Sequence, residues 1–251
     1  MKICMIGTGY VGLVSGTCFA DIGHQVYCVD KDLSKINQLN SGISPIYEPG
    51  LDELIKKNHK AKRLYFTSDL KKAITVSDII FICVGTPNIK GSLKVDLSFV
   101  FKCTKEILAI TKKKKIIVTK STVPIGTGDQ IENIIKKKKK LFSVISNPEF
   151  LREGEAIRDF RYPDRIIIGS NSKNEFKTMK KLYSPLINKG AKFFTTSRRG
   201  AELIKYAANA FLATKITFIN EIANLCERSG INVKDIALGI GSDTRIGSRF
   251  L

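Results

Sequence analysis

The first twelve residues, MKICMIGTGYVG, place the glycine spacing Gly7-x-Gly9-x-x-Gly12 directly after a short apolar run. A second apolar run, over residues 25–29, ends at Asp30. A strand, a glycine-rich turn that begins a helix, and a second strand with a terminal carboxylate form the pattern that binds dinucleotides. Gly7 permits the tight turn, Gly9 lets the backbone approach a pyrophosphate, and Gly12 lets helix and strand pack closely.

The same pattern predicts how the nucleotide is held. Tyr10 and Val11 begin the helix whose unpaired N–H groups would bind the phosphates. Asp30 would accept hydrogen bonds from the adenosine ribose, and its charge would repel a 2′-phosphate, so the sequence favours NAD over NADP. Lys31 softens this preference without reversing it. The alternative is a glycine-rich turn that serves packing alone.

Threonines follow two further apolar runs. Thr86 ends the fourth run in VGTP, and Thr122 follows the fifth in STVPIGTGD. Ligands of open α/β sheets bind at the carboxyl ends of the strands, so we expect both threonines at that edge, with Thr122 contacting a cofactor or a substrate hydroxyl. The alternative for Thr122 is a hydroxyl that serves a turn or a helix cap.

The densest polar stretch, NPEFLREGEAIRDFRYPDR at 147–165, follows the sixth apolar run. Asn147-Pro148 fixes a turn there, and Glu149 and Glu153 share one face if the segment is helical. A carboxylate beside an oxidisable alcohol can act as a base. Nearby arginines would suit a diphosphate, namely Arg152, Arg158, Arg161 and Arg165. The alternative is an exposed segment of salt bridges.

Lys205 and Asn209 lie four residues apart in a long helical pattern, about 198–229, with Gly230 as its predicted C-cap. This helix is apolar on nearly every face, so we expect it to be buried between domains or subunits. A lysine buried among alanines and phenylalanines needs a ligand or a carboxylate partner. The alternative is a lysine on the surface.

The elements that must position these residues alternate along the chain. Apolar runs predict strands over 2–7, 25–30, 64–68, 78–85, 115–121, 141–146, 165–170 and 191–196. Helical patterns lie near 10–22, 32–40, 50–58, 69–75, 96–110, 127–138 and 173–183. Apolar strands separated by helices predict an α/β fold, a Rossmann-type doubly wound parallel sheet followed by the long central helix. We expect an NAD-binding domain at 1–197 and a central helical segment at 198–251.

The charge balance is strongly basic, with 42 Lys and Arg against 23 Asp and Glu, or +19. The lysine runs at 112–115 and 136–140 directly precede predicted strands, at the edge of the sheet opposite to the ligand edge. No aromatic residues interleave them and no nucleic-acid motif is present. The runs therefore predict a solvated lysine-rich surface, and nucleic-acid binding is the alternative.

Other features of the composition argue against a zinc site, a membrane span and a signal peptide. The six cysteines are scattered without a C-x-x-C pair, which excludes a familiar zinc site and predicts buried structural thiols. No window approaches the roughly 20 apolar residues of a membrane span. The first residues lack the cleavage motif of a signal peptide. These features predict a cytoplasmic protein with no membrane partner.

Taken in order, the motifs resemble the UDP-glucose/GDP-mannose dehydrogenase family. The resemblance covers the whole chain and runs through GTGYVGLVSG, VGTP, STVPIGTGD, NPEFLREGEAIRDF, PDRIIIG, ELIKYAANAFLATKITFINEIA and GIGSDTRIG. It implies the amino-terminal part of an enzyme that oxidises the C6 alcohol of UDP-glucose to the carboxylate of UDP-glucuronate. Two NAD would be reduced, and a cysteine thioester would carry the intermediate.

The resemblance also implies roles for the predicted site residues. Thr122 and Glu149 would handle water and proton transfer, and Glu153 would sit near the cofactor and the reacting centre. Lys205 would stabilise the developing oxyanion. Asn209 would position the sugar and the nucleophile.

Further residues follow from the same resemblance. Lys35 would assist at the adenosine ribose. Arg245 would reach the substrate of a neighbouring subunit, which with the central helix implies a homodimer. The remaining predicted substrate contacts are Phe150, Leu151, Arg152, Phe250 and Leu251.

The chain departs from the family pattern at its end, where residues 239–251 are typical of a loop. In the family, a glycine-rich stretch with the nucleophilic cysteine and a carboxy-terminal UDP-binding domain follow, and these 251 residues include neither. None of the six cysteines stands in that context. Two alternatives stay open: a related dehydrogenase acting on GDP-mannose or a UDP-amino-sugar, and a non-catalytic NAD-binding remnant.

Overall fold

The structure is a computed structural model that describes residues 1–251, except for the side chain of residue 139. The chain divides into two compact units, Met1–Leu203 and Ile204–Leu251. Helix α10 (Arg198–Ser229) begins in the first unit and continues into the second. The first unit contains the sheet, and the second contains most of α10 together with α11 (Val233–Gly241).

Within the described residues, eight strands form one sheet in the order β3-β2-β1-β4-β5-β6-β7-β8. The strands are β1 (Lys2–Ile6), β2 (Gln25–Val29), β3 (Leu64–Thr67), β4 (Ile79–Ile82), β5 (Lys115–Thr119), β6 (Phe142–Ser146), β7 (Arg165–Gly169) and β8 (Lys192–Thr196). Each lies inside a predicted strand. The predicted doubly wound parallel sheet is therefore confirmed, with one exception.

The exception is the pairing of β6 with β7, which is antiparallel and joins Ser146 to Gly169. All other neighbouring strands pair in parallel. A parallel neighbour requires a crossover that returns the chain to the starting edge. The connection after β6 instead carries the chain beyond the carboxyl edge of the sheet, and β7 returns toward that edge, so that its last residue, Gly169, pairs with the last residue of β6, Ser146.

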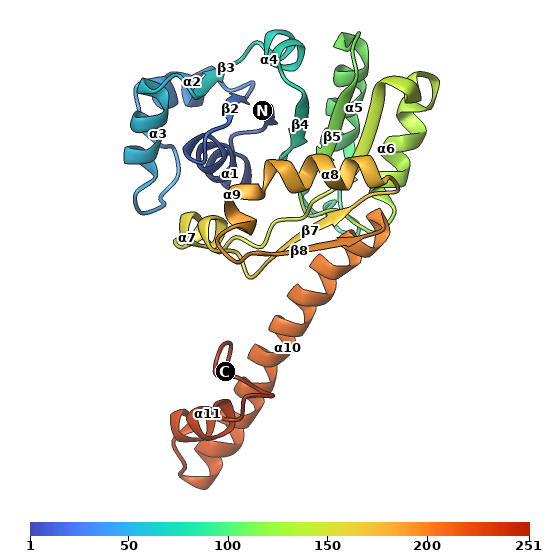
Figure 1. Ribbon diagram of the computed structural model, residues 1–251. Coiled ribbons are helices and arrows are strands. Elements are labelled where there is room, and N and C mark those ends of the chain that lie inside the picture. Colours follow the sequence, from blue (N-terminus) through green and yellow to red (C-terminus); the bar gives the residue numbers. More distant parts are fainter. The chain divides into compact units, whose positions relative to one another are not determined.

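Helices cover both faces of the sheet (Figure 1). Along β1, Ile3 and Met5 belong to one core, with side chains from α1, α2, α3, α7, α8 and α9, whereas Cys4 and Ile6 belong to a second core with α4, α5 and α6. The bounds are α1 (Tyr10–Asp21), α2 (Leu33–Asn40), α3 (Leu51–Lys60), α4 (Leu70–Val76), α5 (Ser98–Ile110), α6 (Thr127–Ile135), α7 (Ala156–Arg161), α8 (Lys173–Leu182) and α9 (Ser184–Ile187). Strands buried on both faces explain the continuous apolar runs of the sequence.

Three helices, α7, α9 and α11, were outside the sequence prediction. The first two are short, with bounds Ala156–Arg161 and Ser184–Ile187, so neither repeats an apolar pattern often enough to be recognised. The predicted helix at 127–138 ends earlier, at Ile135, and the 3-10 segment η1 (Lys136–Leu141) follows it. Elsewhere the predicted helices are found.

The second unit is built on the carboxyl-terminal part of α10. Gly230 follows the helix with a φ of +68°, which confirms the predicted C-cap. Asn232 then caps α11 by accepting a hydrogen bond from the N–H of Lys234. Lys215 donates from Nζ to the carbonyl oxygens of Ile246 and Gly247 at 3.0 and 3.1 Å, which ties the last residues to α10.

The prediction that α10 is buried between domains or subunits stays a prediction, because the chain is described without a partner. Phe211, Ile216 and Phe218 are all exposed. Within the second unit, α11 and the segment after it leave these three side chains uncovered. Lys205 is nevertheless buried, as its apolar sequence context predicts.

One lysine of the predicted surface runs is buried. Lys115 begins β5, and its Nζ donates to the carbonyl oxygens of Thr75 and Ser77 at the carboxyl end of α4. Burial lowers the pKa of Lys115, while the charge of Asp78 opposes this shift. The negative end of a helix stabilises a cation, which explains why a lysine is tolerated at this position.

The buried His24 predicts an acid-sensitive step in stability. Its Nε2 lies 2.8 Å from the carbonyl oxygen of Leu182, and its ring lies beside Phe19. Burial lowers the pKa of His24 below its ordinary value of 6.5. The unfolded chain therefore binds a proton at a higher pH than the folded protein. We predict that the free energy of unfolding is highest above pH 6.5 and falls as the pH decreases through the folded-state pKa.

Denaturant unfolding across this pH range checks the prediction. His24→Phe removes the titrating group and should flatten the profile between neutral and mildly acidic pH. His59→Gln, at the exposed second histidine of the chain, is the matched control and should leave the profile unchanged. Equal pH profiles for the wild type and His24→Phe would contradict the prediction.

Candidate active site

The turn between β1 and α1 has the close packing that the glycine spacing predicts. Gly7 has a φ of +102°, and a Cβ atom there would lie 2.6 Å from the carbonyl oxygen of Cys83. A Cβ atom on Gly12 would lie 2.0 Å from the carbonyl oxygen of Gly7. Around Gly9, by contrast, nothing lies within 4 Å of the position of a Cβ atom. The turn is therefore tight on the side of the sheet and open on the side where a pyrophosphate would approach.

The first turn of α1 is available to an anion. Gly9 is the N-cap residue and has no side chain to satisfy the N–H groups that follow it, and Tyr10 and Val11 begin the helix. The first N–H groups of a helix lack partners within the helix and carry its partial positive charge. This arrangement fits the phosphates of a dinucleotide.

Asp30, which follows β2, holds the glycine turn in place. Its Oδ2 accepts hydrogen bonds from the N–H of Thr8 at 2.9 Å and from the Thr8 hydroxyl at 2.7 Å, and its Oδ1 accepts one from the N–H of Asp32. Burial raises the pKa of Asp30, but these hydrogen bonds and the charge of Lys35 outweigh it and lower the pKa below its ordinary value. A carboxylate has sites for further donors, such as ribose hydroxyls.

The loops after β4 and β5 are joined side by side. The Thr86 hydroxyl donates to the carbonyl oxygen of Thr122 at 2.9 Å, and the Ser121 hydroxyl donates to the carbonyl oxygen of Val84 at 2.7 Å. Because β4 and β5 pair in parallel, both loops leave the sheet at one edge. The structure thus brings the two predicted threonines together, beside the turn that follows β1.

Asn147 fixes the direction of the chain after β6. It is buried, its Nδ2 donates to the carbonyl oxygen of Ile167 at 2.9 Å, and its Oδ1 accepts a hydrogen bond from the Tyr183 hydroxyl at 2.6 Å. Glu149 follows, half-buried, and accepts a hydrogen bond from the N–H of Leu151. Burial raises the pKa of Cys83 to about 12, and the charge of Glu149 adds to that shift. Because β6, β5 and β4 pair in parallel, Glu149 follows β6 at the same edge of the sheet as the loops after β4 and β5.

Glu149 and Glu153 do not share a helical face, because the chain between them is not helical and α7 begins only at Ala156. Gly154, with a φ of +85°, lies between Glu153 and that helix. Glu153 is exposed, and its charge contributes to raising the pKa of Tyr10. The structure thus places Glu153 toward the start of α1 rather than beside Glu149 on one helix.

Glu48 connects the start of α1 with the segment before α7, and it was not identified from the sequence. It is buried, its Oε2 accepts hydrogen bonds from the Tyr10 hydroxyl and from the N–H of Gly154, and its Oε1 accepts one from the N–H of Ile157. Burial and the hydrogen bond to Glu48 raise the pKa of Tyr10 to about 12. In the sequence, this glutamate stands between two prolines in SPIYEPG, a composition typical of an ordinary loop, so nothing there indicated a buried carboxylate.

Most arginines of the 147–165 segment are engaged within the first unit. Arg152 forms ion pairs with Asp159 and Glu155, and Arg161 forms one with Asp21 at 2.7 Å. The guanidinium of Arg165 lies 4.2 Å from the ring centroid of Phe150. The salt bridges that were the alternative for this stretch are present, and the binding of a diphosphate by its arginines stays a prediction.

The remaining predicted residues lie in the second unit. Lys205 is buried and Asn209 is exposed, both on α10. Arg245 is exposed and makes a two-point ion pair with Asp243. Phe250 has a φ of +69°, and Leu251 approaches Gly241 closely enough that a Cβ atom there would lie 3.3 Å from its Cδ1.

The six cysteines are buried free thiols, as predicted. Burial raises the pKa of each thiol in the sheet core, among them Cys4 and Cys28, so these groups resist ionisation. Within the described residues, no cluster of three or more His, Cys, Asp or Glu is placed to hold a metal ion. Among the same residues, no helix has the length and apolar character required to cross a membrane.

Two domain families match the chain. Residues 1–187 match the NAD-binding domain of the UDP-glucose/GDP-mannose dehydrogenase family, and residues 199–251 match the central domain of that family. The UDP-glucose 6-dehydrogenase of Rhizobium meliloti (strain 1021) is 57% identical over 256 residues, which cover 100% of this chain and 58% of the relative.

Solved structures show the same similarity. A UDP-glucose dehydrogenase from the archaeon Pyrobaculum islandicum superposes with a TM-score of 0.93 at 36% identity, covering 99% of this chain and 58% of the other. A GDP-mannose dehydrogenase from Pseudomonas aeruginosa, solved as a ternary complex, has a TM-score of 0.92 at 36% identity and covers 97% and 57%. The chain thus spans somewhat more than half the length of the relatives it matches.

Asp30 provides the direct test of the cofactor site. We predict that Asp30→Ala weakens NAD binding by about tenfold or more, because a hydrogen bond to a charged group contributes roughly 1.5–3 kcal/mol. Isothermal titration calorimetry measures the effect. Asp69→Ala removes a capping carboxylate after β3 and serves as the control, with no expected change in NAD affinity. Unchanged NAD affinity in Asp30→Ala would contradict the ribose assignment.

Proposed function

Because the chain belongs to the UDP-glucose/GDP-mannose dehydrogenase family, we propose that it serves the NAD-dependent oxidation of UDP-glucose at C6 to UDP-glucuronate. The observation that carries the proposal is that the open glycine turn, the Thr86 and Thr122 loops and Glu149 meet at one edge of the sheet. The identity of 57% with the Rhizobium meliloti enzyme favours UDP-glucose as the substrate.

The cofactor would be held by backbone and carboxylate groups of the first unit. The N–H groups after Gly9 would bind the pyrophosphate, and Asp30, with Lys35 nearby, would bind the adenosine ribose. When bound there, NAD supplies the acceptor for a hydride. Thr86 would contribute by holding the loop after β4 against the loop that carries Thr122, through the hydrogen bond from its hydroxyl to the Thr122 carbonyl oxygen.

Thr122 and Glu149 are assigned to proton handling. Glu149 follows β6 at the carboxyl edge of the sheet, where a carboxylate can accept a proton from an alcohol directly or through a water molecule. Thr122 would orient that water or hydroxyl through its side chain. Glu153 would act near the cofactor, which its position toward the start of α1 supports.

The second unit would contribute groups to the sugar. Lys205 would stabilise the oxyanion as the alcohol loses its proton and hydride, and Asn209 would orient the sugar. Backbone and side chains of Phe150, Leu151, Arg152, Phe250 and Leu251 would contact the substrate, with Arg245 reaching a neighbouring subunit. The thiol step of the family reaction is assigned to none of the six cysteines, because all six are buried.

Turnover with different nucleotide sugars tests the proposal. We expect NADH formation to be fastest with UDP-glucose, and Glu149→Gln to reduce kcat by about 10²-fold or more, the range typical for loss of a general base. NADH absorbance is the measurement. Faster turnover with GDP-mannose or a UDP-amino-sugar would favour a related dehydrogenase, and NAD binding without turnover of any sugar would favour a non-catalytic NAD-binding protein.

We also propose that α10 forms a homodimer. Its exposed Phe211 and Phe218 lie seven residues apart and therefore share one face of the helix, and monomers rarely leave such apolar faces uncovered. Phe218→Glu, at a side chain that is 50% exposed, should shift the protein from dimer to monomer in sedimentation velocity. Leu93→Glu, at an exposed residue of a loop in the first unit, is the control and should leave the dimer intact. A Phe218→Glu protein that stays dimeric would contradict this interface.

A further inference from the structure

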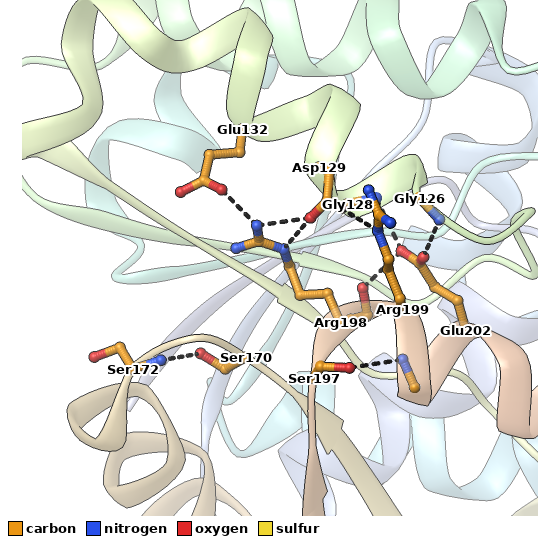
Figure 2. A network of polar contacts seen from close by, with 12 residues as sticks. Gly126, Gly128, Asp129, Glu132, Ser170, Ser172, Ser197, Arg198, Arg199 and Glu202 are labelled. Carbon is orange, nitrogen blue, oxygen red and sulfur yellow. Dashed lines mark hydrogen bonds and ion pairs between the residues drawn. The ribbon is translucent and has the colours of Figure 1, made fainter.

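The start of α6 is closed by a carboxylate from a distant part of the chain. Glu202, in the first turns of α10, is 3% exposed. Its Oε2 accepts a hydrogen bond from the N–H of Gly126 at 2.6 Å, and its Oε1 accepts one from the N–H of Gly128 at 2.8 Å and one from the Ser146 hydroxyl at 3.0 Å. Figure 2 shows this carboxylate pointing into the turn that begins α6.

This contact replaces a local helix cap. Gly126 is the N-cap residue of α6, has a φ of +90° and offers no side-chain oxygen to the N–H groups of the first turn. Those groups need an acceptor, because a buried N–H group without one destabilises the fold. Glu202 supplies the acceptor from 76 residues away.

Gly128 is closely packed against the Glu202 carboxylate. A Cβ atom on Gly128 would lie 3.0 Å from Oε1 of Glu202 and 3.1 Å from the Ser146 hydroxyl oxygen. A side chain at this position would therefore require the carboxylate or the serine hydroxyl to shift by a few tenths of an ångström. Burial raises the pKa of Glu202, while the hydrogen bonds from Gly128, Gly126 and Ser146 oppose the shift.

A second contact holds the same two helices together. Arg198, 4% exposed, donates to Asp129 at 2.8 Å and to Glu132, and Arg199 donates to Asp129 at 2.6 Å. Asp129 and Glu132 both belong to α6 (Figure 2). The first turns of α10 are thus fastened to the first turns of α6 by ion pairs on one side and by the Glu202 carboxylate on the other.

The fastened turn continues directly into the loop that carries Thr122. Thr122 lies four residues before Gly126, and the Thr127 hydroxyl donates to the carbonyl oxygen of Pro124 within this short stretch. The other end of the loop is held by the Thr86 hydroxyl on the carbonyl oxygen of Thr122. A shift of the Gly126 backbone would therefore be transmitted to Thr122, because the segment between the two anchors is short and already hydrogen-bonded.

We propose that Glu202 is a positioning residue for the cofactor site: by capping α6 it holds the loop from Ser121 to Gly126 in the place where Thr122 meets NAD. The proposal rests on the proposed role of Thr122. Glu202 itself touches neither cofactor nor substrate in this proposal. Its effect on binding is indirect and passes through the loop.

Affinity for NAD, measured by calorimetry on the folded protein, tests the proposal. Glu202→Gln keeps the shape but places an NH₂ group against an N–H donor. It should weaken NAD binding by about five- to tenfold, because the apparent affinity falls in proportion to the fraction of molecules whose loop is in the binding position. Ser146→Ala leaves the charge and both backbone contacts, and it should weaken binding by about twofold or less. Glu53→Gln, at an exposed carboxylate in the first turn of α3, is the matched control.

Two further measurements separate positioning from a loss of stability. Ile131→Val removes a buried methyl group from α6 without touching the contact, and it should lower Tm while leaving NAD affinity unchanged. Amide exchange at Gly126 and Gly128 should be faster in Glu202→Gln and unchanged in Ile131→Val. Glu202→Gln with lower Tm and normal NAD affinity would overturn the proposal.

A double-mutant cycle with Thr122→Ala identifies the route. If Glu202 acts through Thr122, the double variant should bind NAD no more weakly than the weaker single variant, whereas independent effects would multiply. Multiplied effects would overturn the proposal. Unchanged NAD affinity in Thr122→Ala would contradict the proposed role of Thr122 and, with it, the route through Thr122. Weaker NAD binding in Thr122→Ala together with unchanged binding in Glu202→Gln would contradict only the proposed role of Glu202.

Discussion

Parallel pairing is the constraint on which the first unit depends. From β3 to β6, every neighbouring pair of strands runs in parallel, so the chain must leave each strand at one edge of the sheet and return to the other edge before the next strand. The loops after β1, β2, β4, β5 and β6 therefore emerge together. Asp30, Thr86, Thr122 and Glu149 lie on these loops, although up to 119 residues separate them in the chain. The opposite edge receives the lysine runs.

The N-termini of α1 and α6 both present backbone N–H groups that can bind an anion, but the two helices use these groups differently. The first N–H groups of a helix lack internal partners and attract an anion. At α1, Gly9 leaves them open beside the glycine turn, which suits an incoming phosphate. At α6, the carboxylate of Glu202 already accepts hydrogen bonds from the N–H groups of Gly126 and Gly128. A ligand is expected at the first helix start, whereas the second is part of the fixed frame around the site.

Buried polar groups connect the elements that bear the site. Glu48 links the start of α1 to the start of α7, Asn147 links β6 to β7 and Tyr183, and Arg198 with Glu202 links α10 to α6. Each makes several hydrogen bonds, as a buried polar group must if its burial is not to destabilise the fold. Such multiply bonded groups limit the positions that the surrounding loops can take, which is what a site for a dinucleotide and a sugar requires.

The sequence by itself determined the strands, the glycine turn, Asp30 and the family resemblance, because apolar periodicity and the spacing of glycines are local properties of the chain. It also placed Thr86, Thr122 and Glu149 at the correct edge, since strand order along the chain sets that edge. Only the tertiary structure showed the hydrogen-bond partners of Glu48 and Glu202. It also showed that β7 pairs antiparallel with β6 and that Lys115 is buried. The function of a charged side chain depends on which backbone groups face it, and those groups come from segments tens of residues away, which no local pattern records.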